Sequence, residues 1–195
     1  DVPTDDRGQS DTGLVDKMLE TALAVCGADI PVIVLSQVSP GFTRERAAGR
    51  ANLFYQVETL IFGRAMERAT RPERIIVGCA ETGDALPAAY RAFLDSFGCP
   101  VLPMRYESAE LAKIAINCML VSSVSAANTL AEVCEAIGAD WSEIVPALRL
   151  DRRIGPAAYI NAGLGISGGN LERDMASVLS MTSAHSTDGG IVSAW

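Results

Sequence analysis

The chain has 195 residues, of which 49% are hydrophobic and 21% charged, a composition that excludes a disordered protein and predicts a globular one with a sizeable core. A formal net charge of −8, with no stripe of lysine and arginine, argues against a nucleic-acid partner. The chain has five cysteines without a Cys-x-x-Cys pair, which predicts a reduced, cytoplasmic chain with no metal site. It has no run of about 18 apolar residues, so no membrane span is expected, and no signal peptide is visible.

The first half of the chain alternates helical and strand patterns. Apolar residues recur at helical spacing in two segments, whereas continuous β-branched runs are typical of strands buried on both faces. In chain order, the sequence predicts a helix over 11–26, strands over 30–38 and 74–80, a helix over 86–97 and a strand over 99–104. This alternation predicts an α/β segment with a parallel sheet, over residues 1–104.

The second half of the chain has a helical composition. From Tyr106 to Gly138 it is dense in Ala, Leu and Glu, and about 30 residues of helix would extend roughly 45 Å. Asp140 is a predicted N-cap of the next helix, and a last helix is predicted over 171–181. We therefore expect an all-helical segment over residues 105–195.

Three polar residues stand out in apolar surroundings. Lys113 and Asn117 are four residues apart on the long predicted helix, so they share one face and could hold a water or stabilise an oxyanion. The alternative is a lysine whose stem covers apolar surface beside a buried amide. Glu58, in "FYQVETLIFG", is either a carboxylate whose pKa burial raises for acid–base chemistry or a surface residue.

A glycine-rich stretch, "GLGISGGNLERD", precedes the last predicted helix. Its glycines, at 163, 165, 168 and 169, could let backbone N–H groups approach an anionic ligand, or form a linker between helices. Asn170 and Asp174, one turn apart, are ligand contacts or helix caps. Arg153, in "DRR", is either a phosphate clamp or part of a solvated charge run.

Several motifs, in the same order, resemble the UDP-glucose/GDP-mannose dehydrogenase family along nearly the whole chain. "VPTD" resembles V-P-T-P, "VIVLSQVSPGFTRE" a strand ending S-T-V-x-P-G-T-T, and "RPERIIVG" P-x-R-I-x-x-G. "SAELAKIAIN" is similar to A-E-L-x-K-x-x-x-N, and "DRRIG…NAGLGISGGNLERD" to D-x-R-I-G…G-x-G-F-G-G-S-C-x-x-K-D.

The resemblance implies the last part of a Rossmann-like NAD-binding domain, followed by a helical central domain that dimerises through its long helix, at about residues 107–136. It also implies a nucleotide-sugar substrate and polysaccharide precursor synthesis. In the family, the C6 alcohol of the sugar becomes a carboxylic acid with two NAD, through a thiohemiacetal and a thioester on a cysteine.

Site residues follow from the same resemblance. Lys113, Asn117 and Asp174 match the residues that stabilise the oxyanion and organise water, and Glu58 matches the first glutamate of N-P-E-F-L-x-E-G. Thr4 matches a threonine beside the cofactor, and Gln37 stands at the threonine of S-T-V. Arg153 matches an arginine that reaches a neighbouring subunit's substrate. The predicted contacts to the nucleotide sugar are Arg153, Gly165, Gly168, Gly169 and Asn170.

The departures from the family pattern bear on the reaction. Asn170 stands at the position of the cysteine, and Phe62 at the position of the second glutamate. Cys118 adjoins Asn117, but adjacent helix positions point about 100° apart. The sequence begins with Asp1 and has no G-x-G-x-x-G after a strand, so we expect a piece of a longer protein that binds NAD poorly. Two hypotheses remain. The first is a dehydrogenase that stops after two electrons, at an aldehyde or ketone, or that continues without a covalent intermediate through the aldehyde hydrate. The second is a non-catalytic nucleotide-sugar-binding or dimerisation protein.

Overall fold

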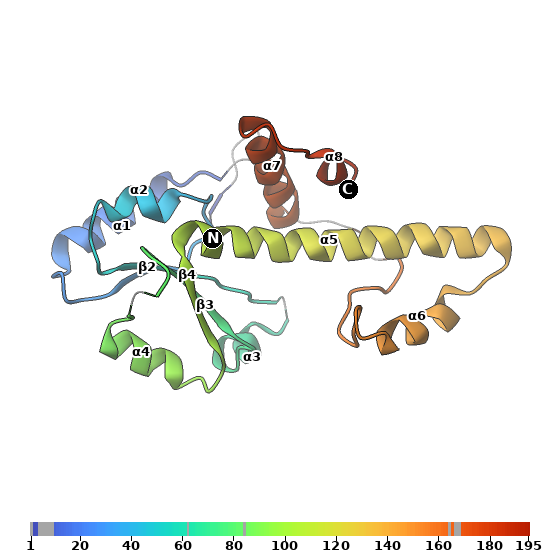
Figure 1. Ribbon diagram of the computed structural model, residues 1–195, viewed down its shortest axis with the longest axis horizontal. Coiled ribbons are helices and arrows are strands. Elements are labelled where there is room, and N and C mark those ends of the chain that lie inside the picture. Colours follow the sequence, from blue (N-terminus) through green and yellow to red (C-terminus); the bar gives the residue numbers. More distant parts are fainter. Residues whose placement is uncertain (1, 4–9, 62, 84, 164, 166–168) are drawn as a thin grey trace. The chain divides into compact units, whose positions relative to one another are not determined.

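The computed structural model describes residues 2–3, 10–61, 63–83, 85–163, 165 and 169–195 (Figure 1). The chain divides into two compact units, Asp1–Lys113 and Ile114–Trp195, here called the first and second units. The boundary between these units lies inside the long helix. The domains expected over residues 1–104 and 105–195 stay a prediction.

The first unit contains a four-stranded sheet in the order β1-β2-β3-β4. Its elements are α1 (Gly13–Val25), β1 (Val32–Val34), α2 (Phe42–Ala47), β2 (Leu53–Gln56), α3 (Ala65–Thr70), β3 (Ile75–Cys79), α4 (Ala88–Asp95) and β4 (Val101–Arg105). The predicted helices over 11–26 and 86–97 and the strands over 74–80 and 99–104 are confirmed. The strand predicted over 30–38 is three residues long, while β2, α2 and α3 were not predicted.

The sheet is not wholly parallel, which corrects the sequence-based expectation. β1 pairs with β2 in parallel, and β3 pairs with β4 in parallel, but β2 and β3 are antiparallel. Among the described residues between β2 and β3, the short α3 is the one regular element. The chain then returns beside the end of β2, where the Val57 N–H donates to the Ile76 carbonyl at 3.1 Å. A parallel pairing would need a crossover connection to the opposite end.

Alternating side chains of β2 pack into two hydrophobic cores, one on each face of the sheet. Leu53 and Tyr55 of β2 pack with α1, α2 and the first turns of the long helix, whereas Phe54 packs with α4 on the other face. Figure 1 shows α1 and α2 on one side of the sheet and α4 on the other. Gly78 of β3 is required by close packing, because a Cβ there would lie 3.0 Å from the Tyr55 Cβ and 3.1 Å from the Ala109 Cβ.

The long helix α5 (Tyr106–Ile137) runs from the first unit into the second, as a single helix of 32 residues. The second unit also contains α6 (Trp141–Leu150), α7 (Gly169–Ala184) and α8 (Gly190–Ser193). Asp140 caps α6, as predicted, and its carboxylate accepts from the Ser142 N–H at 2.7 Å. An α/β segment followed by a helical one with one long helix is thus confirmed.

The expectation of no membrane span stays a prediction, because one described helix has the length and composition that could cross a membrane. Among the described residues, α5 is long enough, and a window of 18 residues within it has a mean hydropathy of 1.5. Length and composition alone also fit a core helix of a globular protein. Ile114, Val121 and Ala127 of α5 are buried within the fold, and Asn117 bonds to a carboxylate of α7. These contacts favour a core helix.

Candidate functional site

A polar contact joins α5 and α7 in the interior of the second unit. Asn117 Nδ2 donates to Asp174 Oδ2 at 2.5 Å, and the two residues are only 7% and 1% exposed. The sequence predicted each residue as a member of a site, and the structure places them in direct contact. A buried carboxylate that accepts from an amide is a charge-assisted hydrogen bond, stronger than a neutral one.

Arg173 extends this contact along α7, and sequence reasoning assigned it no role. It is 2% exposed, and its Nε lies 3.9 Å from Asp174 Oδ1. Its Nη2 donates to Asn170 Oδ1 at 3.0 Å. The available signal was the spacing, because residues 170, 173 and 174 stand at i, i+3 and i+4 and share a helix face. We call Asn117, Asp174, Arg173 and Asn170 the polar relay.

The relay contains one buried positive and one buried negative charge. Either charge alone would be costly to remove from water, and the ion pair between Arg173 and Asp174 offsets part of that cost. Asn170 lies at the solvent end, since its side chain is exposed whereas the other three are buried. The relay therefore connects the protein interior to a side chain that a ligand can reach.

Cys118 follows Asn117 in α5 and is the thiol affected by the relay. Burial raises the pKa of this thiol above its ordinary value, and the nearby charge of Asp174 raises the pKa further. The nucleophilic form of cysteine is the thiolate, and a raised pKa disfavours it at neutral pH. Cys118 is therefore a poor substitute for a catalytic cysteine.

Two other predicted catalytic residues belong to the first unit. Lys113 is the last residue of that unit, is partly buried and lies one turn before Asn117 in α5. Glu58 follows β2, is also partly buried, and lines a cavity of about 500 Å³. The apolar walls of this cavity are formed by residues of β1, β2, α4 and their flanks, including Ile33, Leu35, Val57, Tyr90, Phe93 and Phe97.

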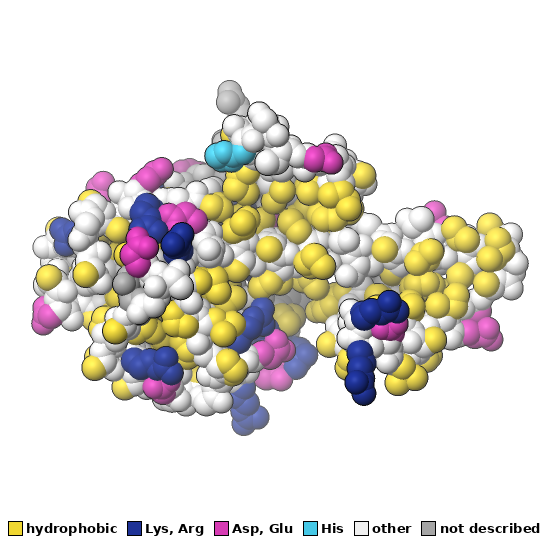
Figure 2. All heavy atoms as spheres, viewed as in Figure 1, with side chains coloured by type: hydrophobic (Ala, Val, Ile, Leu, Met, Phe, Trp, Pro, Cys, Tyr) yellow, Lys and Arg dark blue, Asp and Glu magenta, His cyan; other side chains and the backbone are white. Residues whose placement is uncertain are grey.

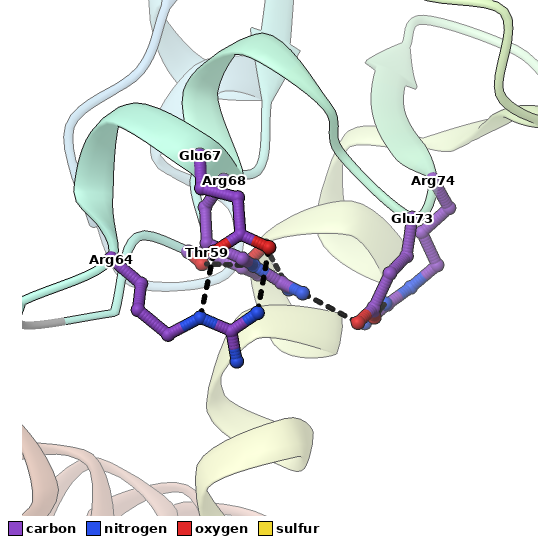
Figure 3. A network of polar contacts seen from close by, with 6 residues as sticks. All are labelled: Thr59, Arg64, Glu67, Arg68, Glu73 and Arg74. Carbon is purple, nitrogen blue, oxygen red and sulfur yellow. Dashed lines mark hydrogen bonds and ion pairs between the residues drawn. The ribbon is translucent and has the colours of Figure 1, made fainter.

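An arginine anchors the backbone next to Glu58. Figure 3 shows Arg68 reaching from α3 to Thr59 and to Glu73. Its Nε donates to the Thr59 carbonyl at 3.4 Å, and its Nη1 donates to Glu73 at 2.6 Å. The Arg68 side chain is 13% exposed, so this anchor is partly shielded from solvent. The neighbouring pair of Arg64 and Glu67, at 2.7 Å, is more exposed.

The remaining predicted contact residues are distributed as follows. Thr4 and Gly168 lie outside the described residues, and Gln37 lies in the loop after β1. The Arg153 side chain is 88% exposed and pairs with Asp151 at 2.6 Å. Gly169 is the first residue of α7. Near Gly165, no described residue has an atom within 4 Å of a Cβ placed there.

Residues 107–195 match the model of the UDP-glucose/GDP-mannose dehydrogenase family, central domain. The chain is 29% identical to UDP-glucose 6-dehydrogenase 3 of Arabidopsis thaliana, over 83% of this chain and 34% of that protein. It is 27% identical to a UDP-glucose 6-dehydrogenase of Rickettsia bellii (strain RML369-C), over 99% of this chain and 46% of that protein. The chain thus spans a third to a half of the length of these relatives.

Solved structures show the same fold. A UDP-glucose dehydrogenase from the hyperthermophilic archaeon Pyrobaculum islandicum superposes with a TM-score of 0.80 at 28% identity, over 99% of this chain and 47% of that one. A UDP-D-ManNAc dehydrogenase from Pyrococcus horikoshii superposes with a TM-score of 0.72 at 20% identity, over 92% of this chain and 44% of that one. The second likeness supports the fold alone.

Proposed function

We propose, because this chain belongs to the UDP-glucose/GDP-mannose dehydrogenase family, that the protein oxidises the sugar of a UDP- or GDP-linked nucleotide sugar with NAD. The observation that carries this proposal is the polar relay, which lies within the segment that matches the family's central domain. Its product would serve polysaccharide precursor synthesis in the cytoplasm, as the family implies.

The predicted site residues have proposed roles in this reaction. Asn117 and Asp174, with Lys113, organise water and stabilise the oxygen of the reacting sugar carbon. An amine and an amide can donate to a developing alkoxide, and a partly buried position strengthens that interaction. Glu58 is the proposed acid–base carboxylate, and Arg153 and the glycines at 165, 168 and 169 are proposed contacts to the nucleotide sugar.

We propose further that the oxidation stops after two electrons. An amide is not a nucleophile, so Asn170 cannot form the covalent intermediate that the second oxidation uses in the family. Cys118 does not replace it, because its raised pKa keeps the sulfur protonated at neutral pH. The expected product is therefore the aldehyde, or its hydrate, rather than the carboxylic acid.

The described residues do not form a complete site for NAD. The spacing G-x-G-x-x-G occurs at residues 163–168, but these follow a loop instead of a strand, whereas the dinucleotide fingerprint lies between a strand and a helix. Of the two predicted cofactor residues, only Gln37 is described. NAD supplies the hydride acceptor in the family reaction, and no step of that transfer is assigned to residues of this chain.

A second proposal concerns assembly through α5. Met119, Leu130, Val133 and Ile137 are 46–72% exposed, and their spacing places them on one side of the helix. Figure 2 shows hydrophobic side chains at the surface over this part of α5. We propose that this stripe is the interface of a homodimer, and light scattering should then give twice the mass of one chain.

The alternative function is a non-catalytic protein that binds a nucleotide sugar or acts as a dimerisation scaffold. Asn170 in place of the nucleophile and the apolar stripe on α5 favour it. The deciding experiment uses the protein expressed from its complete reading frame, with NAD and a panel of UDP- and GDP-sugars. One NADH per sugar supports the proposed function, two contradict the two-electron limit, and binding of a sugar without NADH supports the alternative.

Lysine substitutions give a matched control for this experiment. Lys113→Ala should abolish turnover, because the proposed oxyanion contact is lost. Lys17→Ala, at an exposed site in α1, changes the only other lysine of the chain and should leave turnover unchanged. Equal turnover of both variants would mean that Lys113 has no catalytic part.

A further inference from the structure

Arg173 determines which way the amide of Asn170 points. A guanidinium has only donors, so the amide atom that faces Arg173 Nη2 at 3.0 Å must be the carbonyl oxygen, Oδ1. The NH₂ group of Asn170, on the other branch of the planar amide, is then turned away from the guanidinium. Because Asn170 is exposed, its two N–H donors are available to a ligand.

The guanidinium is itself held in place. Arg173 is 2% exposed, its Nε lies 3.9 Å from Asp174 Oδ1, and Asp174 is in turn bonded to Asn117 of α5. Two hydrogen bonds and one ion pair thus connect Asn170 to a residue of a different helix. Restraint of this kind lowers the entropy that a donor loses on meeting its ligand, and a cationic neighbour polarises the amide toward stronger donation.

We propose that Asn170 Nδ2 donates a hydrogen bond to the oxygen on C6 of the bound nucleotide sugar, and that Arg173 is the positioning residue that aims it. The inference rests on the proposed function, in which position 170 faces the reacting carbon. The site accordingly takes sugars with a hydrogen-bond acceptor on C6, whether an alcohol or an aldehyde, and holds the aldehyde without a covalent bond.

The first test measures whether the Arg173 guanidinium reaches the side chain at 170. In the Asn170→Cys variant, a guanidinium this close should lower the pKa of the new thiol below the ordinary value of about 8.5. Adding Arg173→Met should return the pKa to about 8.5 or above. The pKa is obtained from the pH dependence of alkylation, with mass spectrometry to separate this thiol from the five native ones.

The chain offers a matched control for this titration. Arg149 Nη2 donates to Asn161 Oδ1 at 2.9 Å, an arginine–asparagine contact of the same kind in the same unit. Arg149→Met in the Asn170→Cys background should leave the thiol pKa unchanged. The same thiol pKa with and without Arg173 would overturn the positioning role.

The second test uses the complete protein and its sugar substrate. Loss of one neutral hydrogen bond in Asn170→Ala should lower kcat/KM by about three- to tenfold. Arg173→Lys keeps the positive charge but lacks the guanidinium fork, so it should lower kcat/KM in the parent and have no further effect in the Asn170→Ala background. Additive losses would show that Arg173 does not act through Asn170 and would overturn the proposal.

The failure of this inference can be told apart from that of the proposed function. If the parent protein oxidises a nucleotide sugar and Asn170→Ala does so equally well, the hydrogen bond from Asn170 is refuted and the proposed function stands. If the parent neither binds nor oxidises any sugar of the panel, both proposals fail. A normal urea midpoint for Arg173→Lys confirms that its kinetic effect does not come from unfolding.

Discussion

The side chain of Asp174 should support the folding of the whole second unit. It is 1% exposed, accepts from Asn117 Nδ2 at 2.5 Å and offsets the charge of Arg173, whose Nε is 3.9 Å away. Asp174→Ala removes both interactions at once. The guanidinium then stays in the interior without this carboxylate, and the amide of Asn117 loses its acceptor.

The cost can be bounded from these two contacts. Removing one partner of a buried ion pair costs about 3–5 kcal/mol, and leaving a buried amide donor unsatisfied costs about 1–3 kcal/mol. The pair here is 3.9 Å apart and the two losses overlap, so we expect a decrease of about 4 kcal/mol in the free energy of unfolding. Asp174→Asn keeps an acceptor for Asn117 and should lose less.

Tryptophan fluorescence in urea measures this effect directly. Both tryptophans of the chain, Trp141 and Trp195, lie in the second unit, so their emission reports its unfolding. The control is Asp151→Ala, which removes the carboxylate of an exposed pair with Arg153 and should barely move the midpoint. A midpoint for Asp174→Ala no lower than that of the control would refute the reasoning.

Three further predictions concern other positions. Glu110 is buried and accepts from the Gly41 and Thr43 N–H groups at 2.6 and 2.8 Å. Burial, partly opposed by these bonds, raises its pKa. A raised folded-state pKa contributes stability that is present below the unfolded-state pKa and is lost as the pH rises through the folded-state pKa. The destabilisation by Glu110→Gln should therefore shrink as the pH rises above 4.5, and urea titrations at each pH would measure this change. In Gly165→Ala, the new Cβ contacts no described residue, so the unfolding midpoint should not change, but calorimetry should show weaker nucleotide-sugar binding. Gly163→Ala, at φ +83°, should instead lower the free energy of unfolding by about 1 kcal/mol. Gly78→Ala should cost about 1–3 kcal/mol in the same urea assay, because the new Cβ would lie 3.0 Å from the Tyr55 Cβ.

The sequence predicted those elements whose pattern is long or whose ends carry local signals. The 32 residues of α5 and the Asp140 cap of α6 belong to this group. β2 was missed because its four residues lie within a longer apolar run, "LFYQVETLIF", that has no strand periodicity of its own. The antiparallel pairing of β2 with β3 depends on the path of the segment between them, which periodicity does not determine.

The sequence predicted most of the residues of the candidate site, but it did not predict which of them contact one another. The spacing of Asn170 and Asp174 placed them on one helix face, and the resemblance brought in Asn117 from a distant segment. The spacing placed Arg173 on the same helix face as positions 170 and 174, but its burial could not be predicted from the sequence, because arginine is mostly exposed. The exposed Arg153, by contrast, has the environment that arginine usually has.

The carboxylate of Asp174 acts on a charged or ionisable side chain of each helix, on Arg173 of α7 and on Cys118 of α5. After burial, the charge of Asp174 is what raises the pKa of Cys118, so an anionic sulfur on α5 is opposed. Position 170 lies on the side of the Arg173 guanidinium, where an anionic sulfur would be favoured. The chain has its cysteine at the opposed position and an amide at the favoured one. A guanidinium that favours a thiolate is therefore present beside position 170. We attribute the proposed two-electron limit to Asn170 rather than to Phe62, which stands at the position of the family's second glutamate. Asn170→Cys should then raise the yield from one NADH per sugar to two, and a yield that stays at one would mean that more than the nucleophile is missing.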